Sequence, residues 1–112
     1  MNLKIESKVK DETALINISG EVDMYSSPEF RKAILSLLDQ KIPKIVVDLK
    51  NVTYMDSSGV ATLIEGLQLC AKYGGKLLLS NLQTNVREVF ELTRLDQIFK
   101  IYDDVNTALA NL

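Results

Sequence analysis

The chain has no histidine and only one cysteine among its 112 residues. Without histidine it cannot build Ser-His or Cys-His nucleophilic pairs or an imidazole metal site. Its single cysteine, Cys70, can form neither an internal disulfide nor a thiolate zinc site. Because Cys70 falls within an apolar helical pattern, we expect it to be a small buried hydrophobic residue. We therefore expect no catalytic residues, no cofactor and no metal.

Long apolar runs and basic clusters are also missing. No apolar stretch approaches the roughly 20 residues of a membrane-spanning helix. A net charge of -2 without a basic run argues against direct contact with nucleic acid. The N-terminus is already charged at Lys4 and Glu6, which is too early for a signal peptide. We therefore expect a cytoplasmic protein that contacts neither membrane nor nucleic acid directly.

Two signatures of enzymes that act through a serine or a nucleotide are absent as well. A nucleophile elbow needs Gly-x-Ser-x-Gly and a histidine partner, and a P-loop needs Gly-x-x-x-x-Gly-Lys-[Ser/Thr]. Neither pattern occurs. A phosphoaspartate receiver domain would share the size and the α/β class. It would need an acidic pair after the first strand and a lysine after a late strand, and this order does not occur. These absences favour a binding protein over an enzyme.

What is present indicates one α/β domain over residues 1–112, with an ordinary share of apolar and charged residues. The patterns predict strands at 3–9, 14–18, 44–49, 76–80 and 98–102, and helices from Ser26 to before Pro43, at about 58–73, at 84–92 and through Leu112. Residues 20–25 form a loop or the end of the second strand. A hairpin followed by alternating strands and helices predicts a mixed, mainly parallel sheet of roughly four or five strands with about four helices.

Capping patterns mark three helix ends. Ser26 with Glu29 fits a capping box, and Pro28 suits a first helical turn. Gly74-Gly75 predicts the end of the long central helix. Asp103 or Asp104 is expected to cap the terminal helix.

The most informative segment is Asp56-Ser57-Ser58-Gly59, which lies between a β-branched apolar strand and a long helix. A strand-to-helix junction gathers unpaired backbone N–H groups and the positive end of the helix dipole. Such a position suits a phosphate, so a serine there can carry a phosphoryl group without strain. The segment indicates a switch rather than an enzyme.

The helix after the serines is apolar around most of its circumference. Either it is buried between the sheet and its neighbours, or its start, around Val60 and Ala61, stays exposed as a docking patch. Gly66 costs roughly 1 kcal/mol in a helix interior relative to alanine. We expect close packing at Gly66.

At this point five segments, in this order, resemble the STAS domain and, within it, the bacterial anti-sigma factor antagonists. The segments are residues 20–26, Asp48-Leu49, residues 54–59, residues 74–77, and residues 92–95 with Ile98-Phe99. The resemblance runs from about residue 3 to 110.

The resemblance implies a partner-switching circuit. The unphosphorylated antagonist binds an anti-sigma factor that is itself a serine kinase, and this frees a sigma factor. The kinase then phosphorylates the residue matching Ser57, the complex separates, and a serine phosphatase resets the antagonist. The surface for the kinase is implied to include these residues: Asp23, Tyr25, Ser26, Asp56, Ser58, Gly59, Val60 and Ala61. The family often has glycine where this chain has Ala61, which bears on partner choice.

Several alternatives stay open at this level. Either serine hydroxyl could cap the helix, and only the resemblance assigns the phosphate to Ser57. Asp56 and Asp23 either belong to the partner surface or only complement the helix dipole and shape a turn. The alternative function is a non-switching STAS regulatory or structural subunit of a transporter or stress-signalling complex. A phosphorylatable serine discriminates against that alternative.

Overall fold

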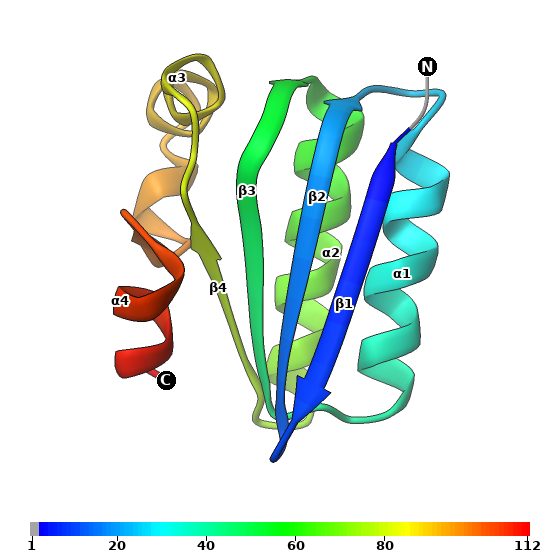
Figure 1. Ribbon diagram of the computed structural model, residues 1–112. Helices are drawn as coiled ribbons and strands as arrows, with labels where there is room; N and C mark the ends of the chain where they lie inside the picture. The colour runs from blue at the N-terminus through cyan, green and yellow to red at the C-terminus, as the bar shows by residue number, and fades with distance from the viewer. Residues whose placement is uncertain (1–2) are drawn as a thin grey trace.

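The computed structural model describes residues 3–112, which form a five-stranded sheet in the order β1-β2-β3-β4-β5 (Figure 1). The strands are β1 (Lys4–Lys10), β2 (Thr13–Val22), β3 (Lys44–Met55), β4 (Lys76–Ser80) and β5 (Ile101–Tyr102), and the α-helices are α1 (Ser27–Asp39), α2 (Ser57–Lys72), α3 (Thr84–Leu92) and α4 (Val105–Ala110). β1 and β2 are antiparallel, and every other neighbouring pair is parallel. The predicted α/β class and mainly parallel sheet are confirmed.

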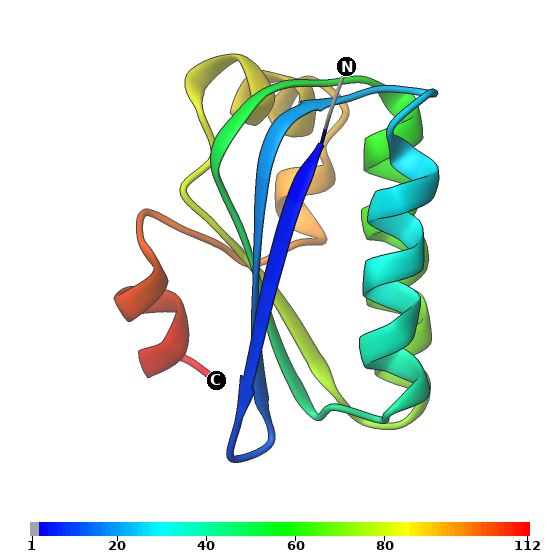
Figure 2. The same ribbon diagram turned by 45° about the vertical axis from the view of Figure 1, so that its right-hand side comes forward.

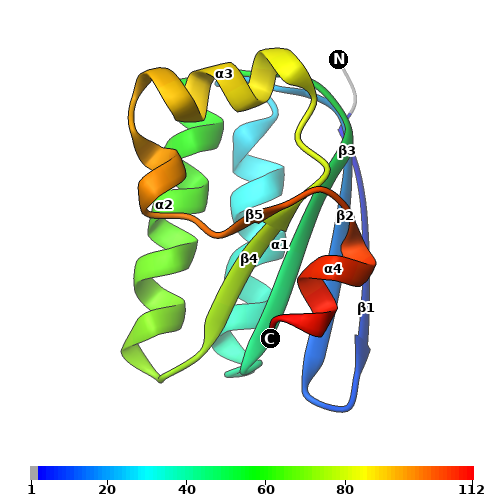
Figure 3. The same ribbon diagram turned by 90° about the vertical axis from the view of Figure 1, so that its left-hand side faces the viewer.

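The helices cover the two faces of the sheet unequally. Figure 2 shows α1 and α2 side by side on one face and the short α4 on the other. The main core lies under α1 and α2, where Ile16, Ile45 and Phe30 are fully buried. α3 crosses the end of the sheet at which the parallel strands finish (Figure 3). This arrangement leaves the start of α2 and the loop after β2 at one end of the molecule.

The strand expected at 44–49 was predicted too short, because β3 continues to Met55. Its pairing with β2 shifts register between Asn17 and Ser19 and again between Gly20 and Glu21. Gly20 takes a φ of 117° there, a value that a side chain rarely tolerates. The irregular pairing disturbs the alternation of buried and exposed residues by which a strand is found in a sequence.

The end of the chain also differs from the prediction. Residues 98–102 were expected to be a strand, but Leu95–Gln97 form a 3-10 helix and only Ile101–Tyr102 pair with β4. Arg94 precedes this helix in the left-handed region, with φ 61°. α4 ends at Ala110 rather than Leu112, and Asp104 is its cap, accepting a 2.7 Å hydrogen bond from the Thr107 N–H.

The prediction of a capping box at the start of α1 is wrong. Ser26 is the N-cap residue but makes no side-chain capping bond, although Pro28 does lie in the first turn. Its hydroxyl instead donates to the Glu21 carbonyl at 2.7 Å and accepts from the Asp23 N–H at 3.0 Å. Ser26 therefore fastens the preceding loop rather than the helix.

α2 is largely enclosed, as the first of the two readings of its sequence expects. A Cβ on Gly66 would lie 3.1 Å from Ile34 Cγ2, so this glycine lets α1 pack closely, as predicted. Cys70 is fully buried, and burial raises the pKa of its thiol. Within residues 3–112, no helix combines the length and apolar character needed to cross a membrane.

Candidate functional site

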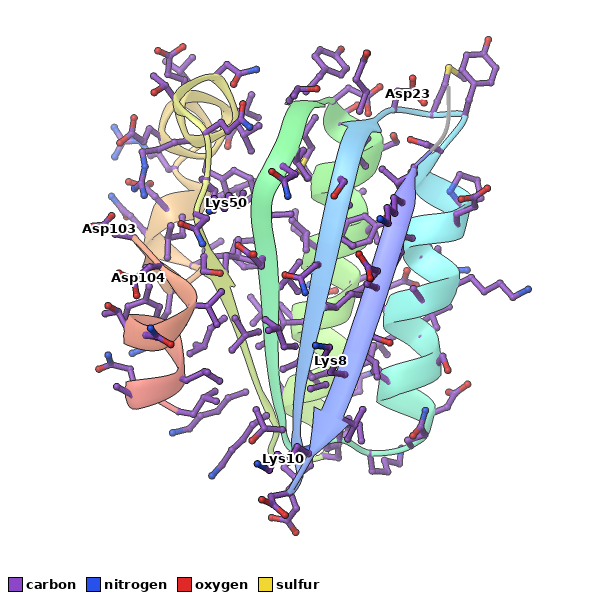
Figure 4. The ribbon with its side chains drawn as sticks, in the orientation of Figure 1. Lys8, Lys10, Asp23, Lys50, Asp103 and Asp104 are labelled. Atoms are coloured by element: carbon purple, nitrogen blue, oxygen red, sulfur yellow. The ribbon has the colours of Figure 1, made fainter. Side chains whose placement is uncertain are left out.

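The serine segment and the loop after β2 lie together because β2 and β3 end side by side. Val22 pairs with Met55 in the parallel ladder, and the Asp56 N–H donates to the Val22 carbonyl at 3.1 Å. Figure 4 shows Asp23 at this end of the sheet, opposite the end that carries Lys10. The two segments implied to form one partner surface are therefore neighbours.

The N-cap of α2 is Asp56, not either serine. Its Oδ1 accepts the Ser58 N–H at 2.9 Å, and the Ser58 hydroxyl donates to the same oxygen at 2.6 Å. The Asp56 carbonyl accepts from the N–H groups of Gly59 and Val60, at 3.1 and 3.2 Å. Most of the N–H groups that were expected to be unpaired at this helix start therefore donate to Asp56. A phosphate here would be favoured mainly by the helix dipole.

The two serines consequently differ. The Ser58 hydroxyl is held by Asp56 and the residue is half-buried. Ser57 is exposed, and its hydroxyl has no hydrogen-bond partner among residues 3–112. Of these two serines, only Ser57 has an exposed hydroxyl without a hydrogen-bond partner among residues 3–112.

The hydrogen bond from the Ser58 hydroxyl, supported by nearby backbone N–H groups, lowers the pKa of Asp56 below its ordinary value of 3.8. The ionised carboxylate is therefore favoured in the folded protein. Asp56 carries a full negative charge beside Ser57 at neutral pH, so a phosphate on Ser57 would add to an existing anion.

This lowered pKa makes the stability contribution of Asp56 depend on pH. Because the folded-state pKa lies below the unfolded value, the contribution is present above about pH 4 and is lost as pH falls through the folded-state pKa. Asp56→Asn should be less stable at neutral pH, and its deficit should shrink on acidification. Chemical denaturation of both proteins between about pH 7 and pH 2 measures this. A deficit that stays constant across this range would contradict the assigned role.

The loop after β2 is shaped by Asp23 and presents two large side chains. Asp23 Oδ1 accepts the N–H groups of Tyr25 and Ser26, at 2.9 and 3.0 Å. Met24 is 67% exposed and Tyr25 is 84% exposed. Asp23 and Ser26 therefore support the loop, while Met24 and Tyr25 are available to a partner. Met24 was missed in the sequence because a methionine in a loop carries no pattern that marks its exposure.

The remaining candidates at the start of α2 divide into buried and exposed. Gly59 is one of the residues that the resemblance implies at the partner surface, but it is buried, and a Cβ there would lie 2.7 Å from both Met55 Cγ and Val22 Cγ1. Val60 is only 8% exposed, which favours the buried reading of this part of α2 over an exposed docking patch at Val60. Ala61 is exposed one turn after Ser57. We call Met24, Tyr25, Ser57 and Ala61 the switch face.

A shallow groove of about 600 Å³ between α1 and α2 borders the switch face, lined by Ser58, Ala61 and Arg31 among others. Arg31 makes two hydrogen bonds to the Glu65 carboxylate, at 2.6 and 2.9 Å. The pairing raises the pKa of Arg31 and lowers that of Glu65. Arg31 is therefore already paired with an acidic side chain. Within residues 3–112, no cluster of acidic or cysteine side chains is suited to hold a metal.

Comparison with known proteins assigns the chain to a family. Residues 4–108 match the STAS domain family. The chain belongs to the STAS domain family. Among its relatives is the anti-sigma-B factor antagonist of Bacillus subtilis (strain 168), 34% identical over 101 residues that cover 90% of this chain and 92% of that protein. The anti-sigma-B factor antagonist of Staphylococcus aureus (strain NCTC 8325 / PS 47) is 28% identical, with coverage of 90% and 94%.

Solved structures share the fold of this STAS domain. An anti-sigma factor antagonist from Mycobacterium paratuberculosis superposes with a TM-score of 0.91 at 25% identity, covering 98% of this chain and 93% of the other. The phosphorylated form of the Bacillus cell fate determinant SpoIIAA superposes with a TM-score of 0.75 at 23% identity, covering 98% of each chain. At that identity the second likeness shows the fold alone.

Proposed function

We propose that this STAS domain is an anti-sigma factor antagonist that works by partner switching. In its unphosphorylated form it binds an anti-sigma factor with serine kinase activity and so releases a sigma factor. Phosphorylation on Ser57 ends this binding, and a serine phosphatase restores it. The observation that carries the proposal is the exposed, unengaged Ser57 hydroxyl, set beside a Ser58 hydroxyl already bound by Asp56.

The switch face supplies the contact surface in this proposal. Met24 and Tyr25 are large, exposed side chains on a loop that Asp23 and Ser26 hold in place. Methionine and tyrosine are enriched in protein interfaces, where they provide much of the buried area. A partner covering this loop and the start of α2 would enclose Ser57.

Charge explains why phosphorylation would release the partner. A phosphoserine carries about −1.5 to −2 charges at neutral pH. The helix dipole offsets that charge by roughly 0.3–1 kcal/mol, so the fold should accept it. In an interface, the same charge beside ionised Asp56 would be forced out of water, and like charges brought together there can cost several kcal/mol. Even about 3 kcal/mol weakens binding roughly a hundredfold.

The proposal assigns no catalysis, cofactor or metal to this chain. The kinase would supply ATP and transfer its terminal phosphoryl group to Ser57 Oγ, and water in the phosphatase would remove it. The domain would act in the cytoplasm, where sigma factors act, without direct contact with nucleic acid or membrane. Its output would be the choice of protein partner.

The test is intact mass measurement and peptide mapping after incubation with ATP and the anti-sigma kinase from the same organism. We expect one added phosphate, located on Ser57, together with loss of the complex. A phosphate on Ser58 would overturn the assignment of the acceptor. No phosphate from an active kinase that binds the chain would overturn the switch and favour a regulatory or structural STAS subunit.

A further inference from the structure

Strand β4 has a partner along only part of one edge. It pairs with β3 over its whole length, from Lys76 to Ser80, but β5 pairs with Leu79 and Ser80 alone. In Figure 3, β5 crosses beside the upper end of β4, and along the first part of β4 only β3 runs beside it, on the opposite edge. The first half of this edge is therefore open.

The backbone of Leu77 faces the open edge. The Lys76 N–H donates toward β3, to the Pro43 carbonyl at 2.7 Å, whereas the Leu79 N–H donates toward β5, to the Lys100 carbonyl at 3.0 Å. Because successive residues of a strand direct these groups to opposite sides, Leu77 directs its own toward β5 as Leu79 does. Within residues 3–112, no backbone hydrogen bond outside the β3–β4 ladder involves the Leu77 N–H or C=O, and Leu77 is only 3% exposed. A strand edge with free N–H and C=O groups can pair with another extended segment.

A pocket of about 250 Å³ adjoins these groups. Its lining includes the apolar side chains Leu67, Leu77, Leu78 and Ile98 and the lysines Lys76 and Lys100. Ile98 is 60% exposed, so its side chain is accessible at the mouth of this pocket. The volume falls below the roughly 300–1,000 Å³ of small-molecule sites and suits a single aliphatic side chain.

We propose that this half-open edge binds an extended segment of a partner protein, in which one aliphatic side chain is flanked by acidic residues. The segment would lie along the first half of β4, on the edge where β5 pairs only with Leu79 and Ser80, and its backbone would form hydrogen bonds with Leu77. Its aliphatic side chain would fill the pocket over Leu67 and Ile98. Lys76 and Lys100, both exposed, provide the complementary charge for the flanking carboxylates.

This site is separate from the switch face and does not rest on the proposed function. β4 begins at the end of the sheet where the parallel strands start, whereas Ser57 follows the opposite end of β3. A partner bound along Leu77 therefore leaves Ser57 uncovered. The two contacts can coexist, and the failure of one leaves the other standing.

The test is titration of the full, ¹⁵N-labelled chain with the peptide acetyl-Thr-Glu-Leu-Glu-Thr-amide, followed by NMR. We expect saturable shifts of the Leu77, Leu78 and Lys100 amides and slower hydrogen exchange at the Leu77 amide. The short contact should give a dissociation constant on the order of 0.1–1 mM. Peptides with lysine in place of glutamate, or serine in place of leucine, should bind more weakly. The absence of these shifts, or equal binding of all three peptides, would overturn the proposal.

Matched charge variants separate specific binding from general attraction. The double variant Lys76→Glu, Lys100→Glu should bind the acidic peptide at least about fivefold more weakly, through loss of two exposed ion pairs. The double variant Lys8→Glu, Lys10→Glu makes the same charge change on β1, at the far edge of the sheet (Figure 4), and should bind normally. Equal weakening would overturn the assigned site. If the same amides shifted when the protein concentration alone was raised, the edge would bind a second copy of this chain. That result would overturn the proposal that a different protein binds there.

Discussion

Ser57→Asp should keep the fold and lose the partner. Ser57 is exposed and its hydroxyl holds nothing within residues 3–112, so an aspartate there breaks no contact. Its carboxylate stands at the start of α2, where the helix dipole favours a negative charge. Against the anti-sigma kinase, the same carboxylate beside Asp56 should weaken binding by about 10- to 100-fold. Isothermal titration calorimetry with the purified kinase measures this difference.

Two variants serve as controls for this effect. Ser57→Ala should bind as the unmodified protein does and should not be released when ATP is added. Ser36→Asp introduces the same charge at an exposed serine in the second half of α1, away from the switch face, and should bind normally. Normal binding by a folded Ser57→Asp protein would argue against release by charge.

Gly59→Ala should be the most destabilising small change at the site. A Cβ at this position would lie 2.7 Å from Met55 Cγ and 2.7 Å from Val22 Cγ1, inside the contact that holds α2 against β2 and β3. Val22 is fully buried and β-branched, so it has little freedom to move aside. Such overpacking costs about 1–3 kcal/mol. Thermal and urea denaturation should show a lower melting temperature and an earlier midpoint.

The second glycine of α2 provides a matched comparison. At Gly66 the nearest approaches of an added Cβ are 3.1 Å to Ile34 Cγ2 and 3.4 Å to Leu77 Cδ1, so the crowding is milder. Alanine also favours a helix interior by roughly 1 kcal/mol over glycine. Gly66→Ala should therefore change stability much less than Gly59→Ala. If Gly59→Ala were the more stable of the two variants, the close approach at the start of α2 would be disproved.

The order of elements was predictable because strands and helices alternate with clear breaks, such as Pro43 and Gly74-Gly75. The extent of β3 was not. Its buried residues Leu49, Val52 and Met55 are three apart, because the irregular pairing with β2 interrupts the two-residue period of a strand. Register shifts depend on the neighbouring strand, so the pattern of a single strand does not reveal them.

The candidate site was likewise predictable only in part. The prediction considered only Ser57 and Ser58 as the cap of α2, although Asp56 is an equally good capping residue and local preference cannot choose among the three. The Asp56 N–H donates to the carbonyl of Val22, the last residue of β2. This bond fixes the position at which β3 ends, and so makes Asp56 the residue that caps α2. Likewise, the burial of Gly59 and the exposure of Met24 follow from tertiary packing.

The measurement that tests the central claim most directly is release of a sigma factor from its complex with the anti-sigma kinase. The complex is formed from the purified proteins, and this chain is added in its unphosphorylated form and, separately, with phosphate mapped to Ser57. We predict that the unphosphorylated chain displaces the sigma factor and that the phosphorylated chain does not. Displacement by both forms, or by neither, would contradict the account.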